Sequence, residues 1–139
     1  MIILDTNVLS ALMQSAPEAR VVRWLDRQPG ESTWTTSVSV FEVRVGLATM
    51  PGGKRQRAYE DAFSRLLSED LENRVLDFDV AAASEAAAFA GERQRHGRPA
   101  DFRDMQIAGI ALARRGSIAT RNGRDFEGAG IAIVDPWRD

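Results

Sequence analysis

Cysteine is absent from this sequence of 139 residues, and histidine occurs once, as His96. The chain therefore offers no disulfide, no thiol nucleophile and no ligands for an iron–sulfur cluster or a structural zinc site. A Ser-His-Asp triad would depend on His96 alone, and its place in the basic stretch 93–98 is more typical of an exposed helix end. Any metal that this protein binds should have oxygen ligands.

Long hydrophobic runs are also missing. The longest apolar run in the C-terminal half covers residues 107–113, far fewer than the roughly 18 residues that a membrane span needs. The amino-terminal residues, Met1 to Asp5, lack the basic and long apolar segments of a secretion signal. We therefore expect a cytoplasmic protein with no membrane association.

The charge is nearly balanced, with 18 Lys and Arg against 20 Asp and Glu, which gives a net charge of −2. Hydrophobic residues make up 44% and charged residues 27% of the chain, which is ordinary globular composition and excludes disorder as the main state. The length suits one domain that spans residues 1–139.

Short apolar runs alternate with segments of helical spacing. The runs at 2–4, 75–76, 118–120 and 131–134 are typical of strands buried on both faces of a parallel sheet. Helical spacing of apolar residues occurs at 38–48, 58–66, 80–95 and 105–112. This alternation predicts an α/β fold, with a central and mostly parallel sheet flanked by helices.

Two acidic residues near strand ends stand out: one precedes a predicted helix and the other lies on one. Asp5 directly follows the first strand, where it or Thr6 could simply cap the next helix. Glu42 lies on a mostly apolar helix, where a capping box with Ser39 would also explain it, although Ser37 is an equally good cap.

Two further acids follow the same pattern later in the chain. Asp104 is in line with the buried face of its helix, but it would also lie in the first helical turn if Asp101 is the cap. Asp125 follows the strand at 118–120 within a polar segment, which a surface turn at Asn122 and Gly123 could equally explain.

Taken together, these acids suggest a metal site. The chemistry of an open parallel sheet lies beyond the carboxyl ends of its strands. Four carboxylates that all reach this edge would repel one another strongly unless they surround a divalent cation. Ligands that are all oxygen atoms favour Mg²⁺ or Mn²⁺.

Four motifs, in this order, resemble those of the PIN-domain ribonucleases, and most closely the VapC toxins of bacterial toxin–antitoxin pairs. They are Leu4-Asp5-Thr6-Asn7-Val8-Leu9, Ser37-Val38-Ser39-Val40-Phe41-Glu42-Val43-Arg44-Val45-Gly46, Arg98-Pro99 with Asp104-Met105-Gln106-Ile107-Ala108, and Ala119-Thr120-Arg121-Asn122 with Asp125-Phe126. The similarity extends to Asp135-Pro136-Trp137 and so covers essentially the whole chain.

The resemblance implies a single PIN-like nuclease domain that hydrolyses RNA phosphodiester bonds with Mg²⁺ or Mn²⁺. It implies a homodimer and a cognate VapB-like antitoxin. It also implies roles for particular residues. The expected metal ligands are Asp5, Glu42, Asp104 and Asp125, and Thr6, Asn7, Thr120 and Asn122 would position these ligands or the substrate.

An acidic protein that cuts RNA needs local positive charge to contact the phosphate backbone. Candidate segments are 54–57 and 93–98, which could equally be solvated helix ends, and Arg121 with Arg124 beside the predicted site. The chief alternative is a non-catalytic RNA- or protein-binding relative on the same fold, against which the intact set of acids argues.

Overall fold

Five short parallel strands form the central sheet of the structure, which is a computed structural model that describes residues 1–139. Their order across the sheet is β3-β2-β1-β4-β5, and all four neighbouring pairs are parallel. The strands are β1 (Ile2–Leu4), β2 (Thr33–Thr36), β3 (Val75–Leu76), β4 (Ser117–Ala119) and β5 (Ile133–Val134). Because every pair is parallel, all the carboxyl ends lie at one edge of the sheet.

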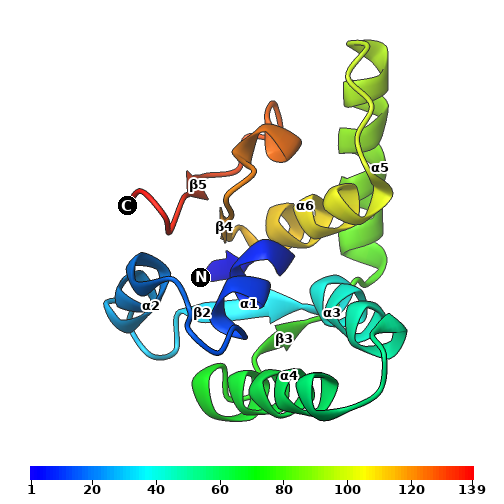
Figure 1. Ribbon diagram of the computed structural model, residues 1–139. Coiled ribbons are helices and arrows are strands. Elements are labelled where there is room, and N and C mark those ends of the chain that lie inside the picture. Colours follow the sequence, from blue (N-terminus) through cyan, green and yellow to red (C-terminus); the bar gives the residue numbers. More distant parts are fainter.

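Helices connect the strands and cover both faces of the sheet (Figure 1). They are α1 (Thr6–Leu12), α2 (Ala19–Asp26), α3 (Ser37–Thr49), α4 (Lys54–Arg65) with the π-helical turn η1 (Leu66–Asp70), α5 (Val80–Arg95), α6 (Phe102–Arg114) and the short 3₁₀ helix η2 (Gly123–Phe126). This is the predicted single-domain α/β architecture.

The sheet separates two hydrophobic cores, because successive side chains of a strand point to opposite faces. Ile3 and Ile118 belong to the core that α5 and α6 cover. Leu4 and Ala119 belong to the other core, which α1, α2 and α4 help to form. The runs Ile2–Leu4 and Ser117–Ala119 are apolar throughout their buried part because both faces are covered.

Side-chain caps fix where several helices begin, and this decides between alternatives that the sequence left open. Asp5 caps α1 and Asp101 caps α6. Thr36 caps α3, since its Oγ1 accepts a hydrogen bond of 3.0 Å from the backbone N–H of Ser39. Neither cap considered from the sequence, Ser37 or Ser39, is therefore the cap of α3, and Glu42 is not part of a capping box with Ser39.

The predicted elements are confirmed with several corrections. The helix predicted at 80–95 has the same bounds in α5, whereas the strand predicted at 131–134 is reduced to Ile133–Val134. On α3, Phe41 and Val45 are exposed, and the buried residues are Val38, Ser39, Val43 and Leu47. No helix has the length and apolar character that crossing a membrane requires.

Candidate active site

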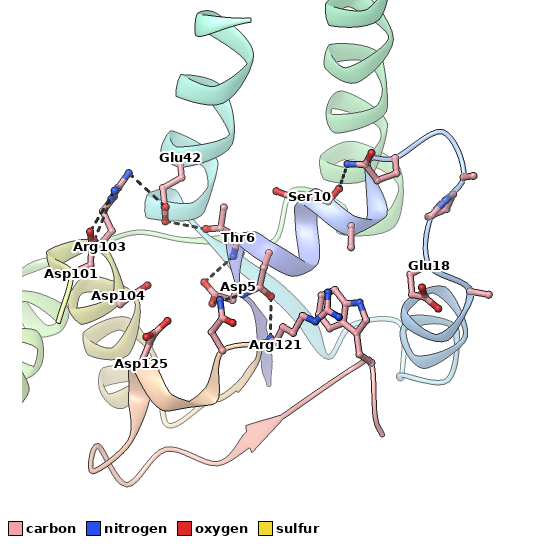
Figure 2. Close-up of a pocket in the computed structure, with 18 residues that line it drawn as sticks. Asp5, Thr6, Ser10, Glu18, Glu42, Asp101, Arg103, Asp104, Arg121 and Asp125 are labelled. Atoms are coloured by element: carbon pink, nitrogen blue, oxygen red, sulfur yellow. Dashed lines mark hydrogen bonds and ion pairs between the residues drawn. The ribbon is translucent and has the colours of Figure 1, made fainter. Parts of the chain in front are cut away.

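The four predicted acids line one pocket of about 890 Å³ at the carboxyl edge of the sheet. Asp5 follows β1, Glu42 comes from the first half of α3, Asp104 from the first turn of α6, and Asp125 from η2. Figure 2 shows these side chains around a common space, reached from four separate segments of the chain. The pocket brings together residues that are up to 120 positions apart in the sequence. Sequence spacing alone could not establish that these residues meet.

Asp5 is the most buried of the four acids, with 5% of its surface exposed. Its Oδ1 accepts the backbone N–H of Thr6 at 2.8 Å, and its Oδ2 accepts the hydroxyl of Thr120 at 2.8 Å and the amide of Asn7 at 3.3 Å. Burial nevertheless raises the pKa of Asp5, and the nearby Asp125 adds to the rise. Capping and metal binding are therefore compatible for this residue, because a carboxylate has lone pairs for both.

Glu42 is held by a small polar network on α1 and α3. The hydroxyl of Thr6 lies 3.0 Å from Oε1 of Glu42 and 2.9 Å from the fully buried hydroxyl of Ser39. Arg103 approaches the other oxygen of Glu42 at 3.7 Å and also contacts Asp101. Burial raises the pKa of Glu42, while the hydrogen bond from Thr6 and the charge of Arg103 oppose this rise.

Asp104 has the most perturbed pKa of the site, raised to about 7. Partial burial is the largest cause, followed by repulsion from the carboxylates of Asp125, Asp5, Asp101 and Glu42. A positive charge among these acids would remove the repulsion. The electrostatics of the pocket therefore favour a cation.

The polar residues predicted to support the acids form a connected network around Asp5. Thr120, which is fully buried, accepts hydrogen bonds from the amide of Asn7 (3.0 Å) and the backbone N–H of Asn122 (3.1 Å) while its own hydroxyl donates to Asp5. Oδ1 of Asn7 accepts the backbone N–H of Arg121 at 3.1 Å. This network joins the end of β4 to the start of α1.

The two arginines predicted beside the site differ in position. Arg121 lines the pocket, with its guanidinium over the ring of Trp137 at 4.9 Å from the centroid. Arg124 is exposed and is not among the residues that line the pocket. In the basic segment 93–98, Arg93 donates to the backbone oxygens of Arg98, Arg124 and Glu127. The guanidinium of Arg93 therefore connects segments of the protein and is less available to contact RNA.

The donor set suits a hard cation, but the side chains do not yet surround one. All four acids supply oxygen ligands, the type that Mg²⁺ and Mn²⁺ prefer. However, no three Asp, Glu or His side chains stand close enough together to hold a metal ion as they are placed. Binding would require the half-buried Asp104 and Asp125 to turn toward Asp5.

Several pocket residues were not predicted as site residues from the sequence, and Arg103, Glu18 and Trp137 are among them. Arg103 lies between two acids of the site in the sequence Asp101-Phe102-Arg103-Asp104, and this alternation of charge was the available signal. Trp137 was noted only as part of the terminal similarity. No pattern in the sequence near Trp137 indicates that it lies close to Asp5 in the folded protein.

Comparison with known proteins gives the family. Residues 2–131 match the model of the PIN domain. The chain belongs to the PIN-domain family. Among curated PIN-domain relatives, the plasmid stability protein StbB of Pseudomonas syringae pv. tomato is 37% identical, with 99% of each chain covered. The VapC ribonuclease Y4jK of Sinorhizobium fredii is 36% identical, with 99% of this chain and 98% of the relative covered.

Solved PIN-domain structures share the whole architecture. The crystal structure of FitAcB from Neisseria gonorrhoeae matches with a TM-score of 0.85 at 31% identity, over 100% of both chains. The structure of DNA-bound VapBC from Salmonella typhimurium matches with a TM-score of 0.79 at 26% identity, over 97% of each chain. The name VapBC denotes a family of toxin–antitoxin systems. Proteins with this PIN fold are therefore found in complexes of that kind.

Proposed function

We propose that this protein is a VapC-type toxin, a Mg²⁺- or Mn²⁺-dependent endoribonuclease that a cognate VapB-like antitoxin neutralises. The observation that carries the proposal is the meeting of Asp5, Glu42, Asp104 and Asp125 in one pocket, where partial burial, followed by repulsion from the neighbouring acids, raises the pKa of Asp104 to about 7. The relative named as a VapC ribonuclease, which is similar along the whole chain, supports the RNA substrate.

Each acid has a role in this proposal. Asp5 and Asp104 would hold the principal cation, and Glu42 and Asp125 would complete the site or orient the attacking water. When bound, the cation would activate water and neutralise charge on the phosphate. Attack of water on the phosphorus, with departure of the 3′-oxygen as the leaving group, would give a 5′-phosphate and a 3′-hydroxyl. A route through two histidines is not open to this chain, because it has only His96.

The surrounding polar groups keep these acids in place. Thr120 and Asn7 fix the carboxylate of Asp5 through hydrogen bonds, and Thr6 does the same for Glu42. Asn122 is held to Thr120 by its backbone and lines the pocket, where its amide can contact the RNA. This arrangement would leave Asp104 and Asp125 as the acids that move when a cation binds.

The proposed partners follow the VapC pattern. The antitoxin would cover the acidic pocket and place a basic side chain among the carboxylates, as Arg103 already does at the rim beside Glu42. A homodimer and a cytoplasmic setting, where the toxin meets both RNA and antitoxin, complete the proposal. Co-expression with the protein encoded next door should give a stable complex and relieve toxicity.

One observation favours the non-catalytic alternative. The acids are too far apart, as placed, for three of them to hold a metal ion. In a binding protein without nuclease activity, these acids would serve only to receive basic groups of a partner. The two proposals differ in whether a divalent cation is required for an RNA reaction.

Chelation tests the proposed function directly. Purified protein is incubated with labelled RNA in EDTA, and then with an excess of Mg²⁺ or Mn²⁺ over the chelator. We expect no cleavage in EDTA and 5′-phosphate products after either cation is restored. Cleavage that continues in EDTA would contradict metal dependence, and intact RNA under every condition would favour the non-catalytic alternative.

A further inference from the structure

The acidic pocket and two adjoining depressions form a series of three that runs along α2. Trp137 lines all three of them. The acidic pocket and the next depression share Arg121, and the last two depressions share Arg20 and Arg138. Arginines are therefore more numerous in the two outer depressions than in the acidic pocket, and the acids that line these depressions are Glu18, Asp135 and Asp139.

Several arginines on this path have no carboxylate close enough to neutralise their charge. Arg20, Arg23, Arg27 and Arg121 are exposed, and none of them forms an ion pair with an acid. The acids of the tail serve other purposes. Asp135 accepts the backbone N–H of Trp137 at 2.9 Å and pairs with Arg138 at 3.7 Å.

Hydrogen bonds hold the C-terminal segment against α2, so the path is a defined surface. Arg20 donates to the backbone oxygen of Trp137 at 3.2 Å, and Arg27 donates to that of Asp139 at 3.1 Å. Figure 1 shows α2 and the C-terminus on the same side of the molecule. Arg121 is anchored through its backbone to Asn7 and its guanidinium lies over Trp137, so it bridges the acidic pocket and the arginines of α2.

We propose that this surface, formed by Arg121, Trp137, Arg20 and Arg23, binds the phosphate backbone of the RNA strand beside the cleaved bond. The proposal rests on the proposed ribonuclease function. A net charge of −2 gives the whole protein no attraction for RNA. The three arginines of this surface have no acidic partners and supply this attraction locally, and a guanidinium matches the geometry of phosphate oxygens.

The surface would contact backbone rather than bases. Its charged groups are guanidinium groups, which contact phosphates irrespective of sequence. Trp137 is only partly exposed and packs against the core below α1 and α2. Its role would be to hold Arg121 in place, because a guanidinium over an aromatic ring is attracted by the ring.

The test compares variants that remove one positive charge each. Arg121→Gln and Arg23→Gln alter side chains that make no hydrogen bond or ion pair within the protein. Arg115→Gln is the matched control, because Arg115 follows α6 and lines a depression at the amino ends of β1 and β4, the opposite edge of the sheet. All variants also carry Asp104→Asn, which blocks cleavage so that binding can be measured.

Fluorescence anisotropy with a labelled 12-nucleotide single-stranded RNA gives the affinity at several salt concentrations. For single strands, each lost phosphate contact should lower the magnitude of the slope of log K against log salt by about 0.7, where K is the association constant. At about 0.1 M salt this corresponds to a loss of affinity of about fivefold. We expect this loss for Arg121→Gln and Arg23→Gln and no loss for Arg115→Gln.

Several outcomes would overturn the proposal. One is an equal loss of RNA affinity in the Arg121→Gln, Arg23→Gln and Arg115→Gln variants, and another is unchanged affinity in all three. A third is that the protein with all of its arginines does not bind the RNA. A lower affinity for the antitoxin with unchanged affinity for RNA would assign the surface to the protein partner instead. Because binding is measured without cleavage, a failure of the ribonuclease proposal shows in the chelation experiment and a failure of this proposal shows in the binding measurement, so the two can be distinguished.

Discussion

Asp104 shows how one residue can be unfavourable for folding and suited to function. Its carboxylate is half-buried in the first turn of α6 and faces the charges of several other acids. No side chain or backbone group donates a hydrogen bond to it, in contrast to Asp5. Under the proposed function, a cation bound in the pocket would supply the positive charge that this carboxylate lacks.

The raised pKa of Asp104 predicts how stability depends on pH in EDTA. Between its ordinary pKa of 3.8 and about 7, the folded state keeps a proton that the unfolded state releases. Stability therefore falls as the pH rises through this interval. Asp104→Asn should remove the effect and raise the free energy of unfolding at pH 8 by about 1–3 kcal/mol, less than the full shift because solvent screens the charge.

Urea unfolding of both proteins at pH 4.5 and pH 8 measures this difference. We expect a gain for Asp104→Asn at pH 8 that shrinks toward pH 4.5. Adding Mg²⁺ at pH 8 should stabilise the wild-type protein more than the variant, since a ligand that binds only the folded state stabilises it. Equal stability of both proteins in EDTA at both pH values would contradict the assigned environment.

At the scale of elements, the pairing of α5 with α6 positions Asp104. Gly109 lies in the middle of α6 and packs against Ala82 and Ala86 of α5. A Cβ at this position would overlap the backbone oxygen of Ala82 and lie 2.6 Å from the Cβ of Ala86, both on α5. Because the backbone of α5 cannot shift easily, the close packing of α6 against α5 requires glycine at position 109.

Gly109→Ala should therefore destabilise the protein by about 1–3 kcal/mol, despite the higher helix propensity of alanine. Gly46→Ala is the matched control, because Gly46 lies in α3 with no atom within 4 Å of an added Cβ. It should be neutral or stabilise by up to about 1 kcal/mol. Thermal and urea unfolding give both values, and equal effects of the two substitutions would show that the α5–α6 contact is not as close as described.

At the scale of the whole molecule, the exposed apolar side chains bear on the expected homodimer. Phe41 and Val45 are 61% and 41% exposed and lie one turn apart on α3, and Phe102 is 78% exposed at the start of α6. The contact between Arg103 and Glu42 brings these two elements together. An apolar surface of this kind is typical of an interface.

Phe41→Glu should shift the protein toward the monomer, because a charge at a buried contact costs several kcal/mol. Sedimentation at micromolar concentration, without antitoxin, measures the mass against the 15.3 kDa of one chain. Phe41→Leu keeps the apolar character and should remain dimeric. A wild-type protein that sediments only as the monomer would contradict the homodimer.

The sequence predicted the strands that are apolar runs, but it missed β2. The buried residues of β2 are Thr33, Thr35 and Thr36, and the hydroxyl groups of Thr35 and Thr36 have hydrogen-bond partners. Thr35 donates to the backbone oxygen of Leu4 at 2.9 Å, and Thr36 caps α3. A strand buried through threonine has no apolar run, so a search for such runs cannot find it.

The candidate site was predicted in part for a similar reason. Asp5, Glu42 and Asp104 could be chosen because each stands at a strand end or on an apolar helix face. The surface of Arg121, Trp137, Arg20 and Arg23 could not, because its members are ordinary solvated residues until the C-terminal segment meets α2. Contacts between distant segments, rather than local patterns, create that surface.

The rate of RNA cleavage by Asp104→Asn, compared with Asp101→Asn, tests the metal-dependent site most directly. Both substitutions remove one negative charge from the same pocket, but Asp101 caps α6, and asparagine caps a helix about as well. With Mg²⁺ or Mn²⁺, we expect Asp104→Asn to lose activity by about 100-fold or more and Asp101→Asn to stay near the wild-type rate. Folded Asp104→Asn that cleaves RNA at the wild-type rate would contradict the assignment of the site.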